Sequence, residues 1–196
     1  MRIHDDRYVR ERRKFEVALR FIRHEARTRT VRVWTGLSDD RIRKLYRSYI
    51  QESSSSQPRA SMPVRHRGKS PRQPAFFTHS ARARHESSSF ASLCRLTGAL
   101  PRGGSALTPE LRRDPAGLAR GELLCEAYEI YCARFTAPIL SFEHAEFLLR
   151  AICRGDELVI GGCRDCSAAL VTDRWSMRPP RCIVCAPPAQ PPAMPT

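Results

Sequence analysis

The sequence lacks any long apolar run. Of its 196 residues 41% are hydrophobic, yet no stretch reaches the roughly 18 consecutive apolar residues of a membrane-spanning helix. The first residues, Met1-Arg2-Ile3-His4-Asp5-Asp6, have the charge of a signal peptide's first segment but no apolar segment behind them. We therefore expect a cytoplasmic protein that does not contact membranes and is not exported.

Residue arrangements typical of enzymes are also missing. The six histidines are scattered, with no cysteine–histidine pair at helical spacing, and Gly103-Gly104 lacks the lysine and hydroxyl residue of a phosphate-binding loop. The carboxylate pairs Glu126/Glu129 and Glu143/Glu146 have the spacing of a solvated or salt-bridged helix face. That interpretation is favoured over an acid–base couple, so the sequence predicts a protein that is not an enzyme.

Positive charge is abundant and concentrated at one end of the chain. The net charge is +14, and residues 1–90 carry 22 Lys/Arg against 9 Asp/Glu, which leaves residues 91–196 almost neutral. A basic half joined to a neutral half is typical of a protein that binds a polyanion at one end. An arginine-rich proteome is the alternative explanation, but the charge favours nucleic acid as the partner.

Residues 28–50 have the outline of a helix-turn-helix. The sequence predicts a short helix at 28–34, a turn around Gly36 and a longer helix that Ser38 caps and that ends near Gln51. On that helix an apolar face is predicted to be buried: Ile42, Leu45, Tyr46 and Tyr49. The candidates for DNA contact lie opposite or at the margin: Arg41, Arg43, Lys44 and Arg47. A solvated basic face is the alternative.

The chain as a whole predicts a mainly α fold with a small zinc module that contains short strands. Further helices are expected at 8–26, at 78–97, after Asp114-Pro115 and after Ser141. The predicted parts follow in order: a helix-turn-helix-like basic region at 1–51, a flexible linker at 52–74, a helical domain at 75–156, the zinc module at 157–186 and a disordered tail at 187–196.

Four of the eight cysteines have the spacing of a metal site, C-x2-C-x15-C-x2-C: Cys163, Cys166, Cys182 and Cys185. Each C-x-x-C pair directs two thiolates to one ion from a tight turn, and four thiolates complete a closed tetrahedron. The sequence therefore predicts a structural zinc ion. A redox dithiol and an iron–sulfur cluster are the alternatives. The other four cysteines are expected to be small buried apolar residues.

Taken together, three features resemble the FlhC family. They are the segment from Gly36 to Tyr46, the proline-containing linker and the ending Cys182-Ile183-Val184-Cys185-Ala186-Pro187-Pro188. The resemblance covers nearly the whole chain, although Ala189-Gln190-Pro191 then stands where the family carries basic residues.

FlhC is the DNA-binding and zinc-binding subunit of a bacterial flagellar transcription activator. The resemblance implies a transcriptional activator subunit that forms a hetero-oligomer with an FlhD-like subunit, binds double-stranded DNA upstream of flagellar operons and recruits RNA polymerase. It also implies zinc at the four cysteines named above. An alternative of a different class is a zinc-ribbon adaptor that binds protein partners, or RNA without sequence preference.

Overall fold

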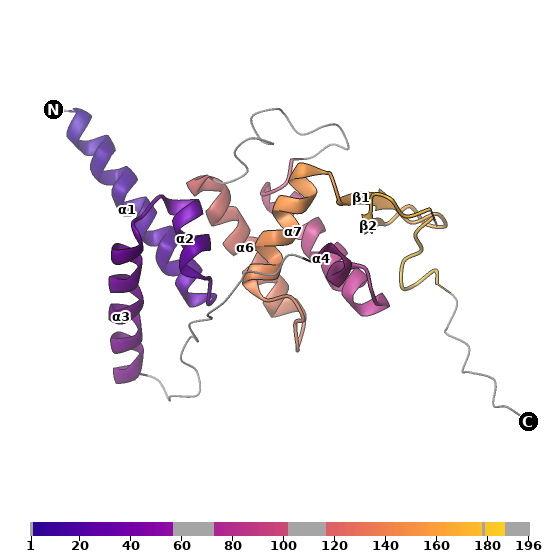
Figure 1. Cartoon of the computed structure of the whole chain (residues 1–196), viewed down its shortest axis with the longest axis horizontal. Helices are drawn as coiled ribbons and strands as arrows, with labels where there is room; N and C mark the ends of the chain where they lie inside the picture. Colours follow the sequence, from indigo (N-terminus) through magenta and orange to yellow (C-terminus); the bar gives the residue numbers. More distant parts are fainter. Residues whose placement is uncertain (1, 57–72, 102–116, 178, 187–196) are drawn as a thin grey trace, which may run out of the picture.

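The computed structural model describes residues 2–56, 73–101, 117–177 and 179–186 (Figure 1). This part of the chain confirms the predicted mainly α fold with short strands. Its helices are α1 (Arg2–Arg23), α2 (Thr28–Thr35), α3 (Asp39–Ser56), a 3-10 helix (Pro74–Phe77), α4 (Ala81–Thr97), α6 (Leu118–Arg134) and α7 (Phe142–Arg154). Its strands are β1 (Leu158–Gly162) and β2 (Ala169–Asp173). Among these residues no helix has the length and apolar character needed to cross a membrane.

The first three helices form a trihelical unit at one end of the molecule (Figure 1). The turn between α2 and α3 depends on Gly36, whose φ of +69° lies in the left-handed region. Ser38 then begins α3, since its Oγ accepts a hydrogen bond from the Arg41 N–H at 3.4 Å. The predicted short helix, turn and capped second helix are therefore confirmed.

Replacement of Gly36 by alanine is expected to reduce the free energy of unfolding by about 1 kcal/mol, because a Cβ is disfavoured at positive φ. Nothing lies within 4 Å of a Cβ built on Gly36, so the effect comes from the backbone alone. Gly161 of β1 (Leu158–Gly162) is the control, because it has no positive φ and an added Cβ there would make only an ordinary contact, 3.6 Å from Thr172 Oγ1. Thermal denaturation of the two variants measures the difference, and equal unfolding temperatures would contradict the explanation.

The trihelical unit shares one hydrophobic core with the later helices. Phe21 of α1 packs edge-on against Phe142 of α7, with ring centroids 4.8 Å apart. Gly121 of α6 lies so close to α1 and α2 that a Cβ there would meet Val17 and Trp34 at 3.3 Å each. The boundary predicted between regions 1–51 and 75–156 therefore does not separate two cores.

A buried carboxylate ties α4 to the segment between α6 and α7. Glu86 accepts hydrogen bonds from the Ile139 N–H at 2.9 Å, from Arg82 Nε at 2.8 Å and from the Tyr131 hydroxyl. Burial opposes ionisation of this carboxyl, but the three donors outweigh it and hold its pKa below the ordinary value. The charged group is thus accommodated inside the helical core.

The two strands form an antiparallel hairpin in which Ile160 lies opposite Val171. Its base is anchored on the helices, because Leu158 and Val171 are buried in the main core. The Val171 N–H also donates to Ser88 Oγ of α4 at 2.9 Å. The hairpin therefore holds the cysteine-bearing turns at a fixed place beside α4, at the end of the molecule opposite the trihelical unit (Figure 1).

Several helix ends differ from the predicted ones. Helix α1 ends at Arg23 rather than at residue 26, since Glu25 adopts a φ of +60°. Helix α3 continues to Ser56, so the predicted linker at 52–74 begins too early. Serine is only a moderately poor helix former, and the next strong stop is Pro58. The linker residues 57–72, the start at Asp114-Pro115 and the tail at 187–196 lie outside the described residues.

Candidate metal centre and basic helix face

The four predicted ligands come together in the structure. The Sγ atoms of Cys163, Cys166, Cys182 and Cys185 all lie within 4.8 Å of one another. A tetrahedral zinc ion with Zn–S bonds of about 2.3 Å requires sulfurs about 3.8 Å apart. The Cys166 and Cys182 sulfurs, 3.6 Å apart, match that requirement closely. The cluster therefore has the geometry of a metal site, and its donor set of four cysteine sulfurs fits zinc.

Tight backbone turns place these sulfurs. The Ser167 N–H donates to the Cys163 carbonyl at 2.8 Å, which closes the first turn, and Ser167 adopts a φ of +60°. The Ala186 N–H donates to the Cys182 carbonyl at 2.8 Å and closes the second. In addition, the Arg164 N–H donates to the Pro180 carbonyl at 3.1 Å and joins the two segments.

Backbone donors also prepare one thiol for ionisation. The Cys182 N–H donates to Cys163 Sγ at 3.3 Å. Together with the N–H groups of Asp165 and Cys166 it lowers the pKa of Cys163 to about 6. A thiolate at this position is the form that binds a metal ion.

The other four cysteines lie outside this cluster. Cys94, Cys125, Cys132 and Cys153 lie in helices, and burial raises the pKa of each thiol. Three of them, Cys94, Cys125 and Cys153, are buried, and Cys132 is half-buried. Their placement confirms the prediction that they are mainly packing residues.

The metal cluster is structurally separate from the main core. Cys163, Leu170 and Cys182, with Cys185 against them, form a small second cluster of their own. We call residues 163–177 and 179–186 the four-cysteine module. So small an apolar cluster contributes little stability, so a metal ion on the four cysteines would supply much of the module's folding free energy.

The four DNA-contact candidates all lie exposed on α3, whereas Ile42 and Tyr46 on its other face are buried. Two of the candidates are engaged with acidic side chains. Arg41 Nη1 lies 3.4 Å from Glu11 of α1, and Arg43 Nη1 lies 2.9 Å from Asp40. In the described part of the chain Lys44 and Arg47 make no ion pair. These two side chains are thus the most available to a polyanion.

Three of the four carboxylates in the pairs Glu126/Glu129 and Glu143/Glu146 have structural partners. Glu129 bonds Arg20 of α1 at 2.8 Å. Glu143 accepts the Arg27 N–H at 2.9 Å, and Glu146 accepts Trp34 Nε1–H at 3.0 Å. These contacts join the trihelical unit to α6 and α7. Sequence reasoning did not find them, because the residues are more than 100 positions apart and no local pattern signals such a pair.

Fold and site together define a mainly helical protein with a four-cysteine metal site beside a two-stranded hairpin. A comparison of the chain with models of known protein families gave no match, and a comparison with curated proteins gave no significant match. The resemblance to FlhC therefore rests on the residues quoted for it, and what it implies is treated below as a proposal.

Proposed function

We propose that this protein binds double-stranded DNA through α3 and carries one structural zinc ion on its four clustered cysteines. The observation that carries the DNA proposal is the arrangement of α2, the Gly36 turn and α3. The apolar face of α3 is held against the core, and its basic face is left exposed. This is the way in which a helix-turn-helix presents its second helix to the major groove.

The charge distribution supports the same surface. Residues 1–90 carry almost all of the excess positive charge, and α3 lies within them. The acidic first turn of α3 is partly neutralised, because Asp40 pairs with Arg43 and Asp39 lies 3.6 Å from Arg32. We expect Lys44 and Arg47 to contact phosphates, and Arg43 to exchange Asp40 for a base or phosphate on binding.

Zinc is the ion that we propose for the cysteines, since four thiolates at these distances are typical of closed structural zinc sites. Such a site leaves no open coordination position, so its contribution is to hold the four-cysteine module together. The resemblance to FlhC extends the proposal to a cytoplasmic transcriptional activator of flagellar operons that works with an FlhD-like subunit and RNA polymerase.

Selection from a pool of random DNA duplexes tests the proposal. The full chain, alone and with an FlhD-like partner, is expected to enrich a recurring sequence and to protect it in a footprint. Binding that shows no preferred sequence and disappears with salt would instead favour the adaptor, with non-specific nucleic-acid contact only. One observation already favours a protein-contacting role for the four-cysteine module, namely the exposed Ile183 and Val184 between two of its ligands.

A further inference from the structure

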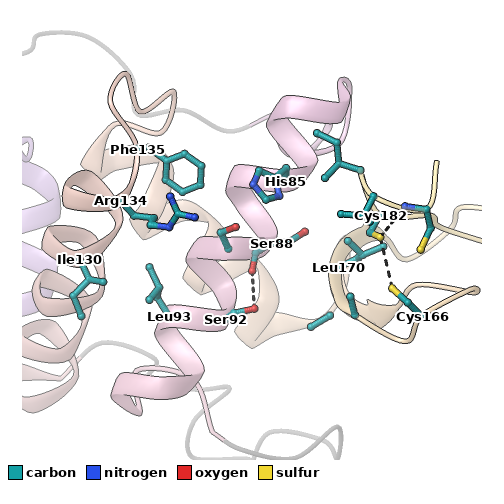
Figure 2. Close-up of a pocket in the computed structure, with 16 residues that line it drawn as sticks. His85, Ser88, Ser92, Leu93, Ile130, Arg134, Phe135, Cys166, Leu170 and Cys182 are labelled. Carbon is teal, nitrogen blue, oxygen red and sulfur yellow. Dashed lines mark hydrogen bonds between the residues drawn. The ribbon is translucent and has the colours of Figure 1, made fainter. Parts of the chain in front are cut away.

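An apolar groove of about 620 Å³ lies between α6, α4 and the four-cysteine module. Figure 2 shows Ile130 and Phe135 on one side of α4, and Leu170 with Cys182 on the other. The larger apolar side chains that line it come from all three parts: Leu93, Ile130, Phe135, Leu170, Ile183 and Val184. The groove lies outside both α3 and the buried core.

The apolar walls of the groove are unusually exposed. Ile130 is 43% exposed, Ile183 is 52% exposed and Val184 is 87% exposed. Aliphatic side chains that gather in one concave place are typical of a site that another apolar surface covers. Ile130 and the adjacent pair Ile183-Val184 reach the groove from two segments far apart in the sequence, so the fold and not local composition assembles this surface.

The described residues that line the groove include basic side chains but no acidic ones. Arg134 is exposed at one end of the groove, beside Phe135 (Figure 2), and makes no ion pair within the described part of the chain. His85 is the other basic group, its ring edge-on to Phe135 with centroids 5.8 Å apart. No carboxylate is found among the described residues that line the groove. An occupant that places a carboxylate near Arg134 would therefore complement the positive charge of the groove.

We propose that this groove is the docking site for a partner protein's apolar segment that carries an acidic residue at one end. The occupant's aliphatic side chains contact Ile130, Ile183 and Val184, and its carboxylate pairs with Arg134. Burial of these side chains supplies the affinity, and the ion pair fixes the direction in which the segment lies.

The metal site forms one wall of the groove. Cys182 and Cys185 line it, and the two residues between them are Ile183 and Val184. The bound ion thus holds the apolar pair in place, so the docking surface is complete only in the metal-loaded chain. This coupling rests on the proposed zinc site, whereas the contacts of Ile130 and Arg134 do not.

A random peptide display library, selected against the zinc-loaded full chain, tests the docking site. The enriched peptides are expected to combine aliphatic residues with an aspartate or glutamate at one end. Their affinity should fall at least about tenfold for Ile130→Asp, which places a carboxylate in the apolar wall. Val33→Asp on α2 is the matched control, because Val33 is 44% exposed and lies outside the lining. It should bind as wild type does.

The Arg134→Glu variant separates charge from apolar contact, since it should select basic in place of acidic peptides. Chelation should weaken peptide binding to the wild type, with zinc content measured in parallel. The proposal is overturned by the absence of enriched peptides, by peptides that bind Ile130→Asp normally, or by an unchanged charge preference in Arg134→Glu. The wild type could instead form dimers in a concentration-dependent way that Ile130→Asp abolishes. That result would assign the groove to a second copy of the chain and would also overturn the proposal. If the chain binds zinc normally but binds no peptide, the docking proposal fails while the proposed zinc site is still supported.

Discussion

Replacement of Cys166 by serine is expected to remove stoichiometric zinc from the protein and to expose the four-cysteine module to proteolysis. Three thiolates hold the ion less well than four, and the small cluster around Cys163 and Leu170 does not stabilise the module without it. Zinc analysis and limited proteolysis measure the two effects. Cleavage should concentrate at the cysteine-bearing turns, within residues 163–168 and 179–186, whereas the helices and the hairpin base should remain resistant, because Leu158 and Val171 are buried in the main core.

Cys132→Ser is the control for this experiment, since Cys132 is half-buried in α6 and lies outside the cluster. It should retain one zinc ion per chain and the protease resistance of the wild type. A Cys166→Ser protein with full zinc content and unchanged resistance would refute the assignment of the site. Iron in place of zinc in the purified wild type would keep the four ligands but change the ion.

Alanine at Arg43, Lys44 and Arg47 together is expected to leave the fold intact and to weaken DNA binding strongly. The three side chains are exposed on α3, opposite the buried Ile42 and Tyr46, so their loss removes no core contact. Each lost phosphate contact should lower the log–log salt dependence of binding by about one unit. A lost base contact should instead cost about 1–3 kcal/mol and relax the preference at one base position.

Gel-shift affinities on a selected and a scrambled site, at two salt concentrations, distinguish the two kinds of contact. Circular dichroism verifies folding. Arg154→Ala is the control, because Arg154 is exposed at the end of α7 and pairs with Asp156 at 3.4 Å, much as Arg43 pairs with Asp40. A folded triple variant that binds the selected site as tightly as the wild type would show that α3 is not the DNA-contacting helix.

The features predicted correctly from the sequence depend on neighbours along the chain. The turn at Gly36 and the cap at Ser38 are such features, and each is visible in a few consecutive residues. The cysteine cluster spans more residues, but the two C-x-x-C pairs limit the geometry almost completely. Local chemistry was therefore sufficient for the helix-turn-helix outline and for the ligand set.

The features that the sequence did not predict are made by distant residues. Trp34 donates a hydrogen bond to Glu146, 112 positions further along the chain. This contact helps to join the first three helices to the region at 75–156, which the sequence predicts as a separate part. The groove likewise combines α4, α6 and the four-cysteine module, so no single segment carries its pattern. The predicted end of α3 near Gln51 differs from the observed end at Ser56 for another reason: a run of serines weakens a helix without ending it.

The two tryptophans give the molecule separate optical reporters. Trp34 is 3% exposed and donates its indole N–H to Glu146, whereas Trp175 in the four-cysteine module is 75% exposed. Emission from Trp34 should be blue-shifted and inaccessible to acrylamide, and that from Trp175 red-shifted and readily quenched. A single-tryptophan variant of each kind would therefore follow the helical core and the metal end independently during unfolding, without any added dye.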